Sequence, residues 1–307
     1  MIMAKTYIDK NQHWVIFGCG YVGTALAEEL LKRGHRVSAL TRNPDKAAAL
    51  RRLGVHKVVC ARLDSDEWHE MMLEPVDIWV NCVSSAGNGL EGYQQSYVEG
   101  MRSILQWSDR YQPGIKRALY TSSTSVYPQD NGEWVDETAD CSAAPATGKI
   151  LLEAEDCLLQ HPAAYPRFVL RLAGIYGPGR SYLIRQLTEG DGVIPGSGDY
   201  TMNCIHRDDC VHAILAILHF ADASAAGIYN AADDQPMHKA RVMGALAELM
   251  SLPTPRFEPA LQSERLRRRG GRMPDRRISN RKLKQTTGWL PRYPSCLSGY
   301  SGLLNTL

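Results

Sequence analysis

The sequence predicts an α/β fold, in which helices wind over both faces of a parallel sheet and a smaller lobe follows toward the C-terminal end. Three observations lead to this fold class. Short runs rich in β-branched residues alternate with longer segments of helical periodicity through the first half of the 307 residues. These short runs are almost continuously apolar, as in strands that are buried on both faces. A glycine-rich turn joins the first run to the first helical segment.

The elements follow in order along the chain. Because strands alternate with helices, each strand–helix–strand unit should close as a right-handed crossover, which makes the strands parallel. Asn43 followed by Pro44 has the pattern of an N-cap and a first helical residue, so a helix should begin there. The expected strands span residues 14–17, 37–40, 57–60, 76–83, 117–120, 168–172 and 228–230. The expected helices span residues 24–32, 44–53, 66–73, 90–111, 146–159 and 211–220.

The second half of the chain is less regular than the first. After residue 232 the composition shifts, and three prolines between residues 253 and 259 predict a loop. We therefore expect residues 1–178 to form the sheet domain, with residues 205–232 returning to it. The smaller, substrate-binding lobe should consist of residues 179–204 and 233–307.

Composition and charge narrow the class of protein. Lys and Arg number 35 against 33 Asp and Glu, and this net charge of +2 argues against a nucleic-acid binder over the whole surface. The eight cysteines include no C-x-x-C pair, which is typical of a reduced intracellular protein without a disulfide framework or zinc site. The first 11 residues lack the apolar segment of a signal peptide, and the longest apolar stretch, 213–218, is too short to span a bilayer. We expect a cytoplasmic protein with no membrane segment.

The first predicted strand runs directly into a G-x-G-x-x-G turn that opens a helix. In this setting Gly18 permits the tight turn, Gly20 lets the backbone approach a pyrophosphate, and Gly23 lets the helix pack on the strand. The helix N-terminus offers N–H groups and the positive end of its dipole to phosphates. The turn therefore predicts a dinucleotide site of Rossmann type in preference to a turn without a ligand. The expected cofactor contacts are Gly18, Cys19, Gly20, Tyr21, Val22 and Gly23.

The end of the second strand predicts the form of the cofactor. An Asp or Glu there would bind the ribose 2′-OH of NAD and repel a 2′-phosphate. This chain has Thr41 at that place and Arg42 after it, and a guanidinium fork suits a phosphate. The two residues favour NADP, with NAD as the alternative if Arg42 is only a solvated residue. The fourth strand should line the same crevice with Asn81, Cys82 and Val83.

Further blocks occur in a specific order over nearly the full length of the chain. Together with the glycine turn, they resemble those of the extended short-chain dehydrogenases/reductases of the NAD-dependent epimerase/dehydratase family. One departure is the glycine turn itself, since extended members more often have G-x-x-G-x-x-G. The blocks are YTSSTSVY at 120–127, RLAGIYGP at 171–178, NCIHRDD at 203–209, GIYN at 227–230, RISNRKL at 277–283 and GW at 288–289.

The resemblance implies a Rossmann-type doubly wound fold with a smaller C-terminal substrate lobe, and a catalytic triad. The triad is a Ser or Thr after the fifth strand, then Tyr-x-x-x-Lys on the next helix. In it the Tyr exchanges a proton with the substrate oxygen during hydride transfer to or from a nicotinamide. Ser123 matches the first position, and Lys149, which would also bind the cofactor ribose, matches the last. The tyrosine position is occupied by Pro145.

Because proline has no ionisable group, three interpretations stay open. The protein binds NADP(H) without turnover, as a sensor or regulatory protein; or it uses another acid, for which Tyr127, Tyr176 and Thr147 are candidates. In the third interpretation, water or a substrate group supplies the proton. The serine-rich block and the RLAG segment resemble a tyrosine-lacking bacterial branch of this superfamily, whose activity is assigned by fold analogy. The family resemblance implies an epimerase/dehydratase-type oxidoreductase on a small or anionic substrate, such as a nucleoside-diphosphate sugar.

Partners and metals are less well specified by the sequence. Residues 256–284 hold eleven basic and three acidic residues, which form a solvated surface, an anion-binding wall or a nucleic-acid patch. Phe257 is the one aromatic residue in this stretch, so stacking on single strands is disfavoured and no nucleic-acid partner is expected. His206, Asp208 and Asp209 are not interpreted as metal ligands; Asp208 or Asp209 is expected to start the helix over 211–220. A monomer and a homodimer both fit the resemblance.

Overall fold

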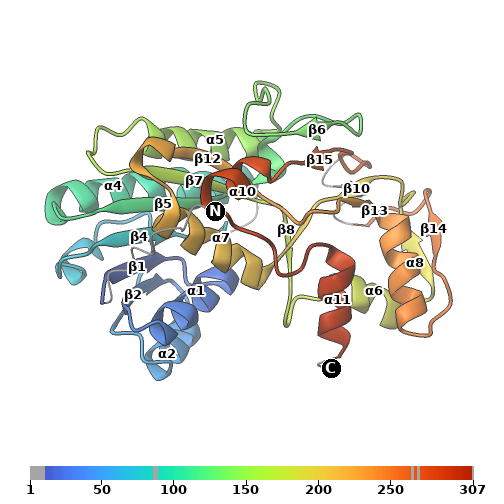
Figure 1. The fold of residues 1–307 in the computed structure, drawn as a ribbon, viewed down its shortest axis with the longest axis horizontal. Coiled ribbons are helices and arrows are strands. Elements are labelled where there is room, and N and C mark those ends of the chain that lie inside the picture. Colours follow the sequence, from blue (N-terminus) through green and yellow to red (C-terminus); the bar gives the residue numbers. More distant parts are fainter. Residues whose placement is uncertain (1–10, 86–88, 264–265, 268–269, 306–307) are drawn as a thin grey trace.

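The computed structural model describes residues 11–85, 89–263, 266–267 and 270–305. Its centre is a seven-stranded sheet in the order β3-β2-β1-β4-β5-β7-β12, and every neighbouring pair runs parallel (Figure 1). The chain builds outward from β1 to β3 and then continues from β4 on the other side of β1, so the winding direction reverses between β1 and β4. The predicted fold class, a doubly wound parallel sheet, is confirmed.

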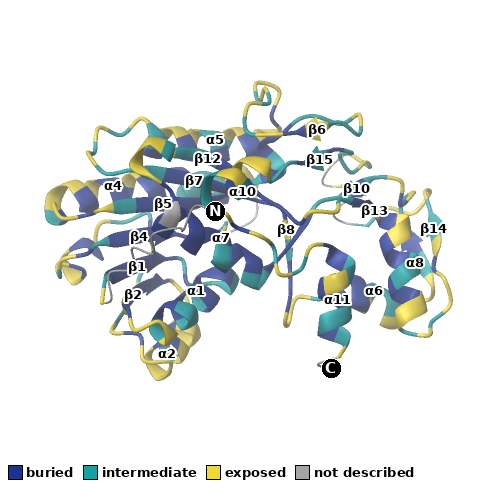
Figure 2. Ribbon diagram, viewed as in Figure 1, coloured by how far each residue is buried: buried dark blue, intermediate teal, exposed yellow. Residues whose placement is uncertain are grey.

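The strands of the sheet lie close to their predicted positions. They are buried between two layers of helices, which explains why the sequence shows apolar runs instead of polar–apolar alternation (Figure 2). The predicted strand 76–83 is shorter in the structure, where only residues 78–81 pair with both β1 and β5. The seven strands are β1 (His13–Phe17), β2 (Arg36–Thr41), β3 (Lys57–Cys60), β4 (Ile78–Asn81), β5 (Arg117–Ser123), β7 (Arg167–Leu172) and β12 (Gly227–Ala231).

Helices cover both faces of the sheet. One face is covered by α1 (Tyr21–Lys32), α2 (Pro44–Arg52) and α7 (Arg207–Phe220). The other face is covered by α4 (Gly100–Tyr111) and α5 (Ala146–Leu159). The apolar side chains on the two faces form two core clusters, and the sheet lies between them.

Two helix predictions need correction. The segment 66–73 forms no α-helix: it holds only a 3-10 turn, η1 (His69–Met71), because so short a segment gains little from helix formation alone. The Trp68 indole is buried instead and donates to the Leu63 carbonyl at 3.2 Å. The segment 90–111 is helical but not uniform. It consists of α3 (Gly89–Tyr93), a π-helix η2 (Gln94–Glu99), and α4.

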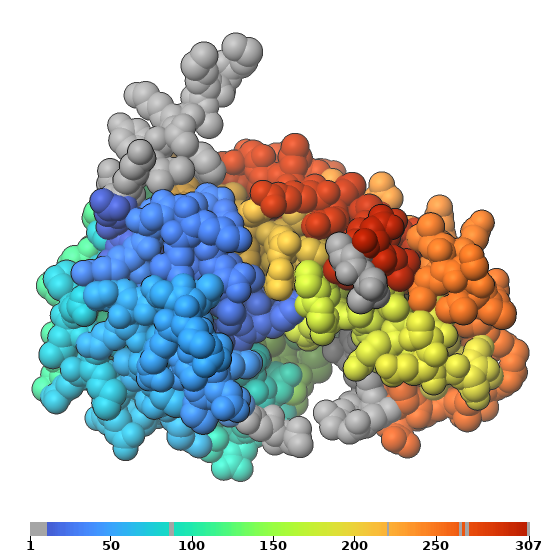
Figure 3. All heavy atoms as spheres, turned by 90° about the horizontal axis from the view of Figure 1, so that it is seen from below, coloured from blue at the N-terminus to red at the C-terminus, as the bar shows by residue number. Residues whose placement is uncertain are grey.

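A third apolar cluster lies outside the sheet, around Tyr176, Leu183, Val242 and Tyr300. Figure 1 shows its helices α6, α8 and α11 together on one side of the sheet, and Figure 3 shows a hollow between them and the blue N-terminal elements. The remaining elements are η3 (Thr124–Val126), β6 (Trp134–Val135), β8 (Gly174–Tyr176), α6 (Tyr182–Thr188), β9 (Val193–Pro195), β10 (Thr201–Met202), β11 (Cys204–His206), η4 (Ala223–Ala225), β13 (Met237–His238), α8 (Lys239–Leu249), β14 (Arg256–Glu258), β15 (Arg277–Ile278), α10 (Arg281–Thr287) and α11 (Cys296–Leu304).

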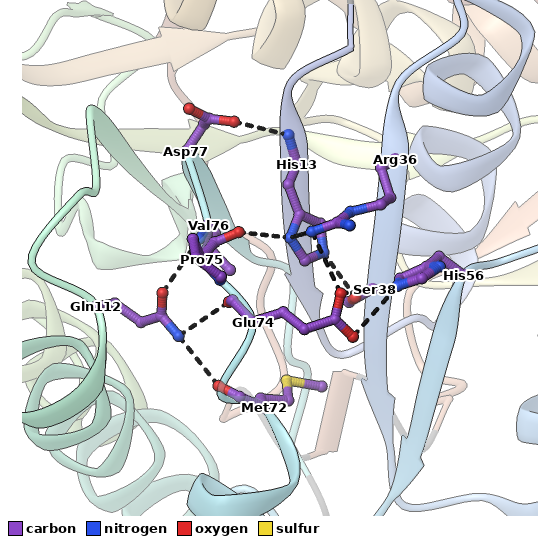
Figure 4. Close-up of polar contacts among 10 residues, drawn as sticks. All are labelled: His13, Arg36, Ser38, His56, Met72, Glu74, Pro75, Val76, Asp77 and Gln112. Atoms are coloured by element: carbon purple, nitrogen blue, oxygen red, sulfur yellow. Dashed lines mark hydrogen bonds and ion pairs between the residues drawn. The ribbon is translucent and has the colours of Figure 1, made fainter.

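A polar network joins the amino ends of β1 and β2 to the segment before β4 (Figure 4). The His13 ring contacts the Pro75 carbonyl through Nδ1 at 2.7 Å and Ser38 Oγ through Nε2 at 2.8 Å. Glu74 forms an ion pair with Arg36 at 3.3 Å beside this ring. The network lies at the edge of the sheet opposite the glycine turn, so it fixes the strands and takes no part in the cleft described below.

Candidate cofactor and substrate cleft

Two cavities lie beside the carboxyl ends of the sheet strands. The first, of about 200 Å³, lies where β1, β2 and β4 end, at the point where the winding direction reverses. Open parallel sheets bind their ligands at such a point. The walls include six residues for which the sequence predicted cofactor contacts: Gly18, Cys19, Gly20, Thr41, Arg42 and Val83.

The glycine turn is shaped for a close approach of the backbone. Gly18 has a left-handed φ of 79°, and a Cβ there would lie 2.6 Å from the backbone nitrogen of Val83. A Cβ at Gly23 would lie 2.6 Å from the Gly18 carbonyl oxygen, so α1 packs on the turn only without a side chain there. A Cβ at Gly20 would meet no described atom nearer than the Gly18 carbonyl oxygen at 3.9 Å. Gly20 therefore borders open space, which fits a pyrophosphate cradle.

The side chains of the other loop residues are held within the protein itself. Cys19 and Val22 are buried in the core, and burial raises the pKa of the Cys19 thiol. Tyr21 donates from its hydroxyl to the Pro178 carbonyl at 2.9 Å, which ties α1 to the segment after β8. The N-cap of α1 is Gly20, which has no side chain to cap the first turn, and such free backbone N–H groups suit a phosphate.

Three cations line the cavity near the end of β2: Arg42, Lys46 and Arg62. Asn43 caps α2 as predicted, since its Oδ1 accepts a hydrogen bond from the Lys46 backbone N–H at 2.9 Å. This cap begins the helix directly after Arg42 and brings Lys46 into the same wall. Arg62 carries an ion pair with Asp64, whose carboxylate lies 2.5 Å away.

Sequence reasoning found Arg42 and missed the other two cations. The signal for Arg62 is the strand register, because Thr41 on β2 pairs with Cys60 on β3 and the two chain segments leave the sheet side by side. The signal for Lys46 is its place in the first turn of the helix that Asn43 caps. Both signals require pairing and capping geometry that a single motif does not carry.

Asn81, Cys82 and Val83 form the turn at the end of β4. Asn81 is fully buried, and its Oδ1 accepts a hydrogen bond from the Val83 N–H at 3.1 Å. The Cys82 N–H donates to the β1 backbone at 2.7 Å, and burial raises the pKa of its thiol to about 12. These contacts hold Val83 and Ser84 in the cavity wall. Asn81 and Cys82 support the wall from behind.

The second cavity, of about 240 Å³, lies between the end of β5 and the third apolar cluster. Ser123 lines it, and the Ser123 Oγ accepts a hydrogen bond from the Ser125 N–H at 3.1 Å. Tyr182 lines this cavity and an adjoining one of about 350 Å³, and so do four other residues, which makes the two an elongated cleft. The cleft is therefore large enough for a small molecule beside the cofactor cavity.

The helix that carries Lys149 begins beside η3. A Cβ at Gly148 would lie 3.3 Å from the Ser125 carbonyl oxygen, so the first turn of α5 packs closely on the segment after β5. Pro145 is the N-cap of this helix, with φ −61° and ψ 160°, as expected for a helix start. Lys149 is exposed, and the described residues that line the two cavities do not include it. The predicted role of Lys149 stays a prediction.

Two tyrosines considered as alternative acids have hydroxyl groups in the protein interior. Tyr127 is 1% exposed and donates to Asn230 Oδ1 at 2.8 Å, and burial raises its pKa to about 12. Tyr176 lines the substrate cleft, but its hydroxyl is directed to the Ser295 carbonyl, 3.5 Å away, and burial raises its pKa far above the usual range. Both hydroxyl hydrogens are therefore used inside the fold.

The described part of the basic stretch 256–284 is dispersed through the structure. Arg276 lines the substrate cleft, and its guanidinium donates to the Thr124 and Gln129 carbonyls at 3.1 Å each. The stretch is therefore partly a cleft wall and partly a solvated surface. Three of its basic residues form ion pairs: Arg256–Glu258, Arg272–Asp130 and Lys284–Asp234.

The described residues contain no cluster of three His, Cys, Asp or Glu side chains placed as metal ligands. His206 instead caps α7, since its Nδ1 accepts a hydrogen bond from the Asp208 N–H at 3.2 Å, so the helix starts before the predicted Asp208 or Asp209. Asp209 is buried and accepts hydrogen bonds from two backbone N–H groups before α11. Over the same described ranges, no helix combines the length and apolarity needed to cross a bilayer.

The fold and the glycine turn define an α/β protein of the dinucleotide-binding Rossmann type, with cavities at the carboxyl ends of its strands. The chain belongs to the NAD dependent epimerase/dehydratase family, whose model matches residues 14–232. The resemblance drawn from the sequence blocks is thereby confirmed.

The sequences of known proteins can be aligned with most of the chain. Protein YeeZ of Escherichia coli K12 is 31% identical over 260 residues, which cover 81% of this chain and 87% of YeeZ. A 3-diazoavenalumate denitrifying reductase of a Streptomyces species is 26% identical over 306 residues, or 91% of this chain and 96% of that protein. A solved structure of UDP-glucuronic acid 4-epimerase from Bacillus cereus, in complex with UDP-glucuronic acid and NAD, has a TM-score of 0.78 at 16% identity. It covers 96% of this chain and 100% of its own, and it shows the shared fold.

Proposed function

We propose that this protein is an NADP(H)-dependent oxidoreductase of the epimerase/dehydratase type that acts on a small, anionic substrate. The observation that carries the proposal is the cofactor cavity. A glycine cradle that is open at Gly20 lies beside Arg42, Lys46 and Arg62, and Thr41 takes the place of a carboxylate at the end of β2. A 2′-phosphate is favoured by such cations, whereas the ribose 2′-OH of NAD calls for an acidic residue.

Each part of the cleft has a proposed task. The glycine turn and the N-terminus of α1 hold the pyrophosphate, and Arg42 with Lys46 holds the 2′-phosphate. The bound nicotinamide supplies or accepts a hydride. Ser123, whose Oγ already accepts from the Ser125 N–H, keeps its own hydrogen to donate to a substrate oxygen. Arg276, which lines the same cleft, orients an anionic group of the substrate.

We also propose a division of labour along the chain. Residues 1–178 with 205–232 form the cofactor domain, and residues 179–204 with 233–307 form the substrate lobe. The third apolar cluster supports this division, because most of its members belong to the second group and lie outside the sheet. The cleft between the end of β5 and this cluster is the place where the two parts would meet over a substrate.

The test is a calorimetric titration with NADPH and with NADH of the unaltered protein, Arg42→Ala and Arg52→Ala. Loss of a charge-assisted contact to phosphate should weaken NADPH binding by Arg42→Ala about tenfold or more and leave NADH binding nearly unchanged. Arg52 lies at the other end of α2 and serves as the matched control, which should bind like the unaltered protein. Equal affinities for NADPH and NADH would refute the NADP preference. Absence of binding to both would refute the oxidoreductase proposal.

A second candidate function rests on Pro145. With proline four residues before Lys149, the position that carries the proton-transferring tyrosine in the family has no ionisable group. The alternative is an NADP(H)-binding sensor that has lost catalysis. A screen of reduced-cofactor oxidation against nucleoside-diphosphate sugars and simple carbonyl acids separates the two. Turnover by the unaltered protein contradicts the sensor, whereas turnover that appears only in Pro145→Tyr supports it.

A further inference from the structure

Tyr97 lies on the π-helix η2, at the carboxyl edge of the sheet. Its ring is half-buried and packs against both core clusters, one on each face of the sheet, so it lies over the sheet edge where the two cores meet. The Tyr97 hydroxyl oxygen accepts a hydrogen bond from the Ser85 N–H at 3.1 Å. Ser85 follows Ser84, which lines the cofactor cavity, as does Ser96 beside Tyr97. The phenol is thus placed at the cofactor end of the strands.

The segment that binds the Tyr97 hydroxyl leaves the sheet next to β5. Asn81 on β4 pairs with Tyr120 on β5, so Ser84 and Ser123 each lie three residues beyond that pair, on neighbouring chain segments. The π-helix also packs on α5, the helix that carries Lys149. Tyr97 therefore contacts the segment after β4, and its helix packs on α5, one of the two segments on which the family resemblance places catalytic groups. The motif itself does not include Tyr97.

The Tyr97 hydroxyl has a hydrogen to give. A phenol both accepts and donates, and the Ser85 N–H uses only an acceptor site. Among the described residues, none accepts the Tyr97 hydroxyl hydrogen. Burial is the largest cause that raises the pKa of Tyr97 to about 12, and the neighbouring Tyr93 is the second. The phenol therefore keeps its proton at neutral pH. The hydroxyl hydrogens of Tyr127 and Tyr176, in contrast, are directed to partners inside the fold.

The helix geometry at this point is itself unusual. A regular α-helix over 90–111 is interrupted by the six π-helical residues 94–99, which include Tyr97. Short π-helical segments are rare and occur often at functional sites. The ring of Tyr93, the last residue of α3, lies 5.2 Å from the Tyr97 ring, and the Tyr97 hydroxyl binds the segment after β4.

We propose that Tyr97 is the proton donor that replaces the tyrosine missing at Pro145, an inference that rests on the proposed oxidoreductase function. In reduction of a carbonyl substrate, the carbonyl carbon gains a hydride from the reduced nicotinamide, which is thereby oxidised. The carbonyl oxygen gains the Tyr97 phenolic proton, and the product is an alcohol. The resulting Tyr97 phenolate takes a proton from solvent, so each turn leaves the protein unchanged. In the oxidative direction Tyr97 accepts the proton instead.

The test uses the cofactor alone, so it needs no substrate. An oxidised nicotinamide carries a positive charge and a reduced one does not, and a cation near a phenol lowers the pKa of that phenol. Tyrosinate absorbance is titrated against pH in the presence of saturating NADP or NADPH, for the unaltered protein, Tyr97→Phe and Tyr93→Phe. In the unaltered protein and in Tyr93→Phe, one tyrosine should titrate about one pH unit or more lower with NADP than with NADPH. This difference should vanish in Tyr97→Phe.

Other outcomes overturn the proposal in distinguishable ways. If NADP binds and the difference is absent, or persists in Tyr97→Phe, Tyr97 does not face the nicotinamide and the inference is wrong while the proposed function stands. If calorimetry detects no cofactor binding, the proposed function fails and the inference fails with it. Should Tyr97→Phe not fold, the same titration is read by NMR in the unaltered protein labelled at the tyrosine ζ-carbon. The Tyr97 signal is then identified through the contact of its hydroxyl group with the Ser85 amide.

Discussion

The Glu155 carboxylate on α5 is bound by the Arg171 guanidinium on β7, with 2.6 Å between Oε2 and Nη2, and both side chains are almost fully buried. Ser122 on β5 donates to the same carboxylate at 2.5 Å, and the Arg171 guanidinium lies 4.9 Å from the centre of the Tyr127 ring. The ion pair therefore links α5, which carries Lys149, to β7. The Ser122 hydrogen bond extends this link to β5, the strand that ends in Ser123. Desolvating two charges costs free energy that offsets their attraction. We therefore expect this ion pair to matter more for the position of α5 against the sheet than for net stability.

Breaking this pair should be costly. Glu155→Gln leaves the Arg171 charge buried without its counter-charge, and such changes destabilise proteins by about 3–5 kcal/mol. Urea denaturation measures the change. Glu153→Gln on the same helix is the matched control, since Glu153 pairs with Arg102 at the surface, and it should cost less than about 1 kcal/mol. Equal effects of the two substitutions would show that the buried pair holds no special place in the fold.

The glycine turn offers a sharper separation between folding and binding. Gly20→Ala adds a methyl group into open space, so the free energy of unfolding should change by less than about 1 kcal/mol. NADPH affinity should nevertheless fall strongly, because the methyl group occupies the path of the pyrophosphate. Gly18→Ala should lose both folding stability and NADPH affinity, since its Cβ would lie 2.6 Å from the Val83 backbone and its φ is 79°. Calorimetry and urea denaturation are measured on each variant.

Unchanged NADPH affinity in Gly20→Ala would contradict the cradle. Gly34→Ala separates strain from contact, because Gly34 has the same φ of 79° with no neighbouring atom within 4 Å of its Cβ. It should lose about 1 kcal/mol or somewhat more of stability from the backbone conformation alone and no cofactor affinity.

Most strands and helices of this fold could be predicted from local sequence patterns, and the exceptions have physical causes. Buried parallel strands are apolar over their whole length, so their positions could be predicted almost residue by residue. The segment 66–73 has helical periodicity but is too short, and tertiary contacts of Trp68 decide its conformation. Lys46, Arg62 and Tyr97 escaped prediction for another reason. Arg62 and Lys46 reach the cofactor cavity through strand register and a helix cap, and Tyr97 reaches the segment after β4 from a π-helical turn. These are properties of the assembled sheet.

Stability should decline in mild acid because of two stacked histidines. The His35 and His219 rings lie 6.1 Å apart beside Trp14, at the amino edge of the sheet. Burial, with His35 the next largest cause, lowers the pKa of His219 to about 4, and burial also lowers the pKa of His35. The unfolded chain therefore binds protons near pH 6.5 that the folded chain binds only at lower pH.

The sign follows from this difference. The contribution of His219 is complete above about pH 6.5 and is lost as the pH falls toward 4, by about 3 kcal/mol in all. Urea midpoints measured between pH 7.5 and 4 should show this decline, and His219→Leu should remove about one proton from its slope. A slope that is the same in His219→Leu would assign the acid sensitivity to other groups.

The last prediction concerns Tyr127, the residue for which the sequence and the structure suggest different roles. The sequence makes it a candidate acid, but its hydroxyl donates to Asn230 Oδ1 at 2.8 Å and is buried between η3 and β12. Tyr127→Phe leaves the Asn230 carbonyl oxygen without its donor, so unfolding should become easier by about 1–2 kcal/mol. NADPH affinity should stay within about twofold of the unaltered protein, and the NADP-dependent tyrosine titration should be unchanged. If Tyr127→Phe removes that titration while the protein stays folded, Tyr127 and not Tyr97 contacts the nicotinamide, and the proton route runs through η3.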